Sequence, residues 1–106
     1  MATITSIDSI KEVIRHYADI LKNELNIRGV YIYGSYAKGT FNEDSDIDVI
    51  VVSDDFTGDL FNDRLKLMRL RRNIDTRIEP YPVMTDEFNE TNPFIYEIAN
   101  NIIKVE

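Results

Sequence analysis

The stretch Ile47–Val52 (Ile-Asp-Val-Ile-Val-Val) constrains the fold more than any other part of this chain. It is apolar except for Asp48, and its β-branched residues favour an extended backbone. A strand with apolar residues on both of its faces is typical of a sheet that is covered on both sides. We therefore predict an α/β (α+β) fold, in which helices flank a small mixed sheet of about four strands.

The spacing of apolar residues predicts the helices that could cover this sheet. Apolar residues recur at helical spacing over residues 6–25. Ser9 with Glu12 has the pattern of a capping box, and Ser6 is an alternative cap one turn earlier. A second helix over 60–72 is expected to bury Leu60, Leu67 and Leu70 or close neighbours.

Two further strands are predicted, over residues 28–33 and 74–83, because both stretches contain β-branched and aromatic residues. Pro80 and Pro82 cannot donate to a strand ladder, so the far end of the later strand is expected at a sheet edge. The remaining predicted elements are a helical turn at 35–38 closed by Gly39, a turn at 86–90, a helix at 93–100 capped by Asn92 and a short strand at 102–105.

Composition excludes several classes of protein. A chain of 106 residues suggests one domain, here a single domain over residues 1–106. The absence of cysteine excludes disulfides and cysteine-based zinc sites. No apolar run approaches the roughly 20 residues that span a bilayer, and residues 1–6 lack the basic and apolar regions of a signal peptide. We therefore expect a cytoplasmic protein that does not enter a membrane.

The charge balance is acidic, because 12 Lys and Arg residues stand against 19 Asp and Glu residues, for a formal net charge of −7. Such a surface repels phosphate backbones, so long nucleic acid is a poor partner. An acidic protein that handles a nucleotide needs divalent cations. A basic cluster in the second helix either guides a nucleotide or partner or is a solvated face; it contains Lys66, Arg69, Arg71 and Arg72.

Two polar groups lie at the ends of neighbouring predicted strands, Gly34-Ser35 after one and Asp46-Ile47-Asp48 at the start of the next. Residues i and i+2 of a strand point to the same face, so both aspartates project the same way. Their α-carbons are then about 6.6 Å apart, a spacing from which two carboxylates can converge on metal ions about 3.5–4 Å apart. Hard oxygen ligands of this kind select Mg²⁺ or Mn²⁺.

The Gly34-Ser35 turn is suited to a phosphate. Gly34 permits a close backbone approach, and a short helix that opens at Ser35 would direct its amide N–H groups at an anion. Ser35 is expected to bind phosphate rather than act as a nucleophile, since no histidine lies near it in sequence. Lys38 is either a further contact to a triphosphate or a solvated side chain, and Tyr36 either stacks on a base or sugar or packs within the protein.

The residues Gly34-Ser35, ten intervening residues and then Asp46-x-Asp48 together resemble the signature of the polymerase-β-like nucleotidyltransferase superfamily. The fuller strings, Gly-Ser-Tyr-Ala-Lys-Gly-Thr and Ser-Asp-Ile-Asp-Val, are similar to those of its minimal, MNT-type members, and the motif covers about a fifth of the chain. The resemblance implies a two-metal transfer, in which both aspartates bind Mg²⁺ and the Gly-Ser turn holds the β- and γ-phosphates of ATP or another nucleoside triphosphate. Lys38 departs from the pattern, because relatives often have arginine there and lysine lacks its planar, two-pronged grip.

The resemblance also implies a third carboxylate, from a later strand, that binds the second metal ion and activates the attacking hydroxyl. Glu79 is favoured because strand-forming residues flank it, whereas Asp75 lies beside a helix end. Asp54 and Asp55 are weaker candidates. A glutamate departs from the aspartate that is usual in the family, and its longer side chain could alter the metal geometry.

The expected function is a Mg²⁺-dependent nucleotidyltransferase that moves a nucleoside monophosphate, AMP from ATP, to an acceptor hydroxyl. By resemblance, minimal members often act beside a helical HEPN protein, as the antitoxin half of a toxin–antitoxin pair that can adenylylate its partner. We therefore expect a HEPN-type partner to supply the hydroxyl, most plausibly from a tyrosine. Two alternatives stay open: a catalytically weak binding module that neutralises its partner by occlusion, and an enzyme that modifies a small molecule such as an aminoglycoside.

Overall fold

The computed structural model describes residues 6–42 and 44–106, so the expectation about a signal peptide concerns residues that lie almost entirely outside the described part. Its four strands form one sheet in the order β3-β2-β1-β4. β1 pairs antiparallel with β2 and with β4, whereas β2 and β3 run parallel, which confirms the predicted mixed sheet. The strands are β1 (Ile27–Tyr33), β2 (Ile47–Ser53), β3 (Ile78–Met84) and β4 (Ile103–Lys104).

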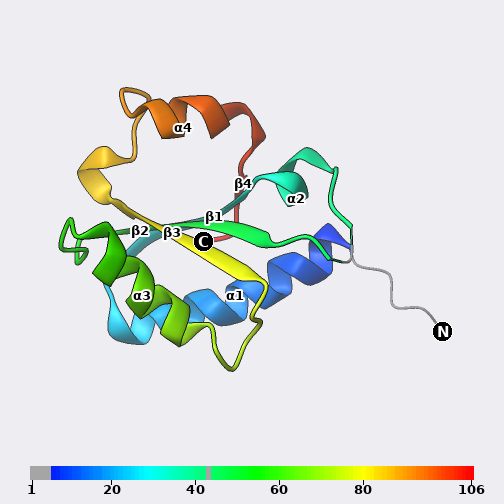
Figure 1. Ribbon diagram of the computed structural model, residues 1–106, viewed down its shortest axis with the longest axis horizontal. Coiled ribbons are helices and arrows are strands. Elements are labelled where there is room, and N and C mark those ends of the chain that lie inside the picture. Colours follow the sequence, from blue (N-terminus) through cyan, green and yellow to red (C-terminus); the bar gives the residue numbers. More distant parts are fainter. Residues whose placement is uncertain (1–5, 43) are drawn as a thin grey trace.

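Helices cover both faces of this sheet (Figure 1). α1 (Ile7–Glu24) and α3 (Leu60–Leu70) lie on one face, and α4 (Pro93–Ile98) lies on the other. None of the helices in the described part is long and apolar enough to cross a membrane. The short helix α2 (Ser35–Lys38) joins β1 to β2, and two 3₁₀ turns span Thr85–Glu87 and Ala99–Asn101.

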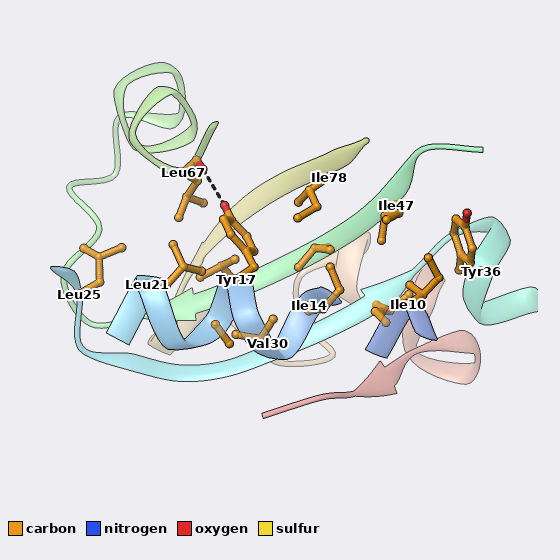
Figure 2. Packing of buried hydrophobic residues seen from close by; sticks show 14 of the residues in the cluster. Ile10, Ile14, Tyr17, Leu21, Leu25, Val30, Tyr36, Ile47, Leu67 and Ile78 are labelled. Atoms are coloured by element: carbon orange, nitrogen blue, oxygen red, sulfur yellow. Dashed lines mark hydrogen bonds between the residues drawn. The ribbon is translucent and has the colours of Figure 1, made fainter. Parts of the chain in front are cut away.

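β2 is buried on both faces, as its apolar sequence predicts. One set of its side chains packs into the core beneath α1 and α3 (Figure 2), and that set contains Ile47, Val49 and Val51. The alternate residues Ile50 and Val52 pack with Ile95 of α4 in a second, smaller core. Because side chains alternate along a strand, Asp48 lies on the α4 side of the sheet.

α1 is capped by Ser6, the alternative cap, and not by the capping box predicted for Ser9 and Glu12. Ser6 is the cap, and its partner is Ser9, because each side chain accepts a hydrogen bond from the other's backbone N–H at 3.2 Å. Glu12 pairs with Arg15 instead. Deeper in the core, the Tyr17 hydroxyl donates to the Leu67 carbonyl at 2.7 Å and so ties α1 to α3 (Figure 2).

In α3, Leu67 is fully buried, but the expectation that Leu60 is buried is wrong, since half of its surface is exposed. The inner position of the first turn is taken by Asp63, which is 8% exposed. Its carboxylate accepts hydrogen bonds from the backbone N–H groups of Thr57 and Gly58 and from the Thr57 hydroxyl. A polar group therefore closes the loop before α3, and Leu60 faces outward.

β3 begins at Ile78, four residues later than predicted, because residues 71–77 form turns. Asp75 stabilises the last of these turns, where its carboxylate accepts from the Arg77 backbone N–H at 2.9 Å. Pro80 and Pro82 lie in β3, which is an edge strand as their presence predicts.

Candidate active site

Three strand segments bring the predicted site residues to one end of the sheet. β1 ends where β2 begins because the two are antiparallel, and β3 begins beside β2 because those two are parallel. In this register Asp48 is the partner of Tyr33 on one side and of Glu79 on the other. Neighbouring residues in register point to the same face of a sheet, so the three side chains share the α4 side.

The paired carboxylates differ in environment. Asp48 is partly buried in β2, and Asp46 is exposed in the loop just before it. Burial raises the pKa of Asp48 above its ordinary value, and the negative charges of Asp46 and Glu79 raise it further. Negative charge is therefore concentrated around Asp48, and none of the described residues offsets it with a positive charge that lowers the pKa of Asp48.

Gly34 connects β1 to α2 in a backbone conformation that suits only glycine, with φ of 71° and ψ of −146°. A Cβ at this position would lie 2.2 Å from Asp48 Oδ2. The turn and the carboxylate are thus in direct contact, and any side chain at residue 34 would displace one of them.

α2 is a single turn, as predicted. Its first backbone hydrogen bond runs from the Lys38 N–H to the Gly34 carbonyl at 3.0 Å, so the helix itself does not use the amides of residues 35–37. Gly39 ends the turn in the left-handed conformation expected of it, with φ of 76°. Ser35 is partly buried, and Lys38 is exposed.

The structure separates the four candidates for the third carboxylate. Glu79 lies beside Asp48, whereas Asp75 lies in the preceding turn, where the Arg77 side chain donates to both of its carboxylate oxygens and lowers its pKa. Asp54 and Asp55 follow the far end of β2. Asp54 pairs with Arg28 and Thr85, and Asp55 accepts from the Asn26 backbone N–H, so both have structural contacts away from the site.

Glu79 has a basic partner, Arg64 of α3, which donates to its carboxylate at 3.0 Å. Among residues 6–42 and 44–106, no three Asp, Glu, His or Cys side chains converge as they stand on a position where they could hold a metal ion. Asp46, Asp48 and Glu79 all lie at the predicted end of the sheet, but Glu79 forms an ion pair with Arg64.

A cavity of about 450 Å³ lies beside the Gly34 turn. Gly34, Lys38 and Tyr33 line one side of it. The other side comes from Glu97, Ile98 and Asn101, at the end of α4 and in the following 3₁₀ turn. Sequence reasoning missed these three residues, because only the folding of α4 over the sheet brings them to the motif.

The aromatic residues near the site pack against other aromatic side chains of the protein. Tyr33 packs edge-on against Phe94 of α4 with ring centroids 5.5 Å apart, and burial raises its pKa to about 12. Tyr31 stacks on Phe88 at 4.8 Å. Tyr36 packs within the protein: it is 2% exposed, stacks on Phe41 with ring centroids 4.4 Å apart and belongs to the core on the α1 side (Figure 2), so its ring faces are not open to a base or sugar.

Most of the chain matches one protein family. Residues 15–105 match the family described as polymerase beta, nucleotidyltransferase. The chain belongs to this family. The match includes the Gly34 turn and all three carboxylates at the end of the sheet, and it confirms the predicted nucleotidyltransferase class and the polymerase-β-like fold.

Relatives of this nucleotidyltransferase occur in Methanocaldococcus jannaschii. MJ1379, named as a candidate protein adenylyltransferase, is 33% identical over 69 residues, which are 65% of this chain and 69% of that protein. MJ0141, named in the same way, is 29% identical over 101 residues, 93% of this chain and 97% of that protein. The match to MJ0128 is 39% identical over 46 residues and spans only 47% of that protein's length.

Two solved structures share the nucleotidyltransferase fold. A candidate nucleotidyltransferase from Sulfolobus solfataricus aligns with a TM-score of 0.59 and 21% identity, covering 92% of this chain and 77% of that one. A toxin–antitoxin structure with AMP-PNP aligns with a TM-score of 0.60 and 19% identity, covering 91% of this chain and 72% of that one.

Proposed function

We propose that this chain transfers AMP from Mg²⁺-bound ATP to a hydroxyl group of a partner protein. The observation that carries the proposal is the row formed by Asp48 and Glu79 on adjacent strands, with Asp46 two residues earlier. These donors are all carboxylate oxygens, and the pKa of Asp48 is raised by burial first and then by the negative charges of Asp46 and Glu79. Such a donor set fits a hard divalent cation that would neutralise it.

Each group has a role in this reaction. Asp46 and Asp48 would hold Mg²⁺. Glu79 would hold a second Mg²⁺ ion once its ion pair with Arg64 is broken. When bound, Mg²⁺ would neutralise the triphosphate and stabilise the charge that develops at the α-phosphorus.

The chain's own groups position and activate the reactants. The amides that begin at Ser35 would bind the β- and γ-phosphates, with Lys38 as a further cationic contact. Glu79 would take the proton of the acceptor hydroxyl while the oxygen of that hydroxyl forms a bond to the α-phosphorus of ATP. The bond from that phosphorus to the β-phosphate oxygen breaks, and pyrophosphate leaves.

The choice of ATP and of a protein acceptor is supported by the names of the relatives, which are called protein adenylyltransferases, and by the AMP-PNP in the toxin–antitoxin neighbour. We accordingly propose a cytoplasmic antitoxin, acting as a single nucleotidyltransferase domain over residues 1–106, whose partner is a helical HEPN-type toxin. The chain matches 97% of the length of MJ0141 but only 47% of the length of MJ0128. The site supports the nucleotidyl transfer, whereas the acceptor and the partner are proposed from these relatives and from the resemblance to MNT-type proteins.

The test uses two radioactive labels on ATP, with Mg²⁺ and the partner protein. Transfer of AMP predicts that label in the α-phosphate is retained on the partner and that label in the γ-phosphate leaves as pyrophosphate. Retention of the γ-label would show phosphorylation instead and would contradict the proposal. Omitting Mg²⁺, or adding EDTA, should abolish incorporation.

One observation favours a second candidate, a binding module that neutralises its partner by occlusion. The Arg64–Glu79 ion pair occupies the third carboxylate, and the described acids do not converge on a metal position as they stand. The variant Asp46→Asn distinguishes the two functions. Inhibition of the partner would survive this change if the chain acts by occlusion, and would be lost if it acts by AMP transfer.

A further inference from the structure

The outer face of α3 is apolar and uncovered. Leu60, Phe61 and Leu65 are 50%, 75% and 37% exposed, and they are three of the four large apolar side chains that are exposed among the described residues. With Arg64 and Met68 they line a groove of about 550 Å³. We call it the α3 groove. In Figure 1, α3 lies at the periphery of the molecule beside β3, with no described element outside it.

This exposure is not required by the fold. The inner side of α3 is already complete, because Leu67 is fully buried and Asp63 closes the preceding loop. Single exposed apolar residues are common on protein surfaces, but here three large apolar side chains are exposed within two turns of one helix. A contiguous apolar patch of this kind marks an interaction surface.

The border of the α3 groove is basic, although the chain has a formal net charge of −7. A second hollow of about 250 Å³ continues from it, since Leu65 and Met68 line both. Basic side chains form the wall of this hollow: Arg69, Arg71 and Arg72. A segment that fills both hollows would therefore present apolar residues to the first and meet positive charge at the second.

We propose that the α3 groove docks an apolar helical segment of the acceptor-bearing partner, with carboxylates of that segment facing Arg69 and Arg72. Charge complementarity argues against a second copy of this chain as the occupant. A two-fold contact through this face would pair the basic wall with itself, and like charges across an interface are destabilising.

The groove is also joined to the active site, which gives docking a chemical consequence. Arg64 lines the α3 groove and at the same time donates to the Glu79 carboxylate at 3.0 Å. A segment seated in the groove therefore lies against the arginine that holds the proposed proton acceptor. This inference rests on the proposed function, because it assumes that the partner that docks is the one that receives AMP.

The test is photocrosslinking in the producing cells, with p-benzoylphenylalanine in place of Phe61. The matched control has the same residue in place of Tyr96, an aromatic on α4 that is 68% exposed. Docking predicts an adduct at position 61 with one protein, through a helical segment with apolar and acidic residues, and at least about tenfold less adduct at position 96. An adduct with a second copy of the chain, equal adducts at both positions, or no adduct at position 61 would overturn the proposal.

Charge-reversal variants of Arg69 and Arg72 test the proposed contacts between the second hollow and carboxylates of the partner. Reversing both charges, in the double variant Arg69→Glu with Arg72→Glu, should lower the yield of the adduct at position 61 by at least about fivefold, because both proposed contacts to carboxylates are lost and become repulsive. Arg15→Glu, which reverses an exposed charge on α1, should leave the yield unchanged. An unchanged yield in the double variant would overturn the proposed carboxylate contacts.

The same experiment separates this inference from the proposed function. Asp48→Asn should abolish the AMP label on the crosslinked protein while the adduct at position 61 forms as before. An adduct with a protein that never carries AMP would refute AMP transfer to the docked protein, and with it the identity of that protein as the acceptor, whereas the α3 groove would remain a docking surface. AMP transfer that depends on Asp48, without any adduct at position 61, would refute the docking surface alone.

Discussion

Gly34 and Asp48 are in contact across the β1–β2 junction, such that a Cβ on Gly34 would lie 2.2 Å from Asp48 Oδ2. The phosphate turn and the carboxylate row are therefore one structural unit. A triphosphate held by the turn would have its phosphates next to the acids, where a cation between them is attracted by both.

Gly34→Ala should abolish AMP transfer and destabilise the protein. The backbone conformation at Gly34 strains any other residue by about 1–3 kcal/mol, and the added methyl group would displace Asp48. Gly39→Ala is the matched control, because Gly39 also has a positive φ of 76° but a Cβ there meets no atom within 4 Å. Thermal unfolding and label transfer should show a stability loss in both variants and an activity loss only in Gly34→Ala. Comparable activity in the two would contradict the role of this contact.

Glu79→Gln should lower transfer by at least about 100-fold, because an amide can neither accept the hydroxyl proton nor bind a second cation as a carboxylate does. Asp75→Asn should retain transfer but lower the melting temperature, since Asp75 holds Arg77 in the turn before β3. The turnover rate and Tm of both variants decide between them. If Asp75→Asn loses transfer and Glu79→Gln keeps it, the third carboxylate has been assigned to the wrong residue.

Asp48→Asn should stabilise the metal-free protein near neutral pH. The pKa of Asp48 is raised by burial first and then by Asp46 and Glu79. A carboxyl group whose pKa is raised on folding binds its proton more tightly in the folded state, so the fold loses stability as the pH rises through that pKa. Because the side chain is partly exposed, solvent screening limits the effect to about 1 kcal/mol or less, which is a change in Tm of at most about 4–8 °C.

The measurement is the Tm of wild type and Asp48→Asn in EDTA, at about pH 7 and at about pH 3. The variant should melt higher at the upper pH, and the difference should shrink as the pH falls and Asp48 becomes protonated. A variant that is less stable near neutral pH, or a difference that does not change with pH, would contradict the raised pKa of Asp48.

Arg64→Ala should lower the Mg²⁺ concentration that half-saturates the protein. The Arg64–Glu79 pair must break before Glu79 can bind a cation, and an exposed pair of this kind is worth up to about 1 kcal/mol. The expected gain in apparent Mg²⁺ affinity is therefore up to about fivefold, measured by isothermal titration without nucleotide. Arg69→Ala, on the same helix, is the control and should leave the affinity unchanged. A weaker Mg²⁺ affinity in Arg64→Ala would show that Arg64 supports the site rather than competing for Glu79.

Local sequence patterns predicted most elements of this fold. The strand expected at Ile47–Val52 is observed at Ile47–Ser53, and the helical turn at 35–38 is closed by Gly39 as expected. These predictions depended on residues close together in the sequence, such as β-branched runs and a glycine with positive φ. Boundaries were weaker where polar side chains bind the backbone, as Asp75 does before β3.

Features that depend on contacts between residues far apart in the sequence could not be predicted from local patterns. The sequence ranked Glu79 first as the third carboxylate, but only the pairing of β2 with β3 places it beside Asp48. The exposure of Leu60 follows from Asp63 taking the inner position of α3, and the burial of Tyr36 follows from its packing on Phe41. The cavity residues on α4 had no signal in the motif, because the chain returns to the site about 60 residues after it.

The most direct test of the central claim is the transfer of α-labelled AMP from ATP by Asp48→Asn, compared with wild type at equal concentration and with Mg²⁺. The account predicts that the variant remains folded, by circular dichroism and thermal melting, and loses transfer by at least about 100-fold, as expected when a charge-stabilising group is removed from a reaction centre. Unchanged incorporation by a folded Asp48→Asn variant would contradict the assignment of this site.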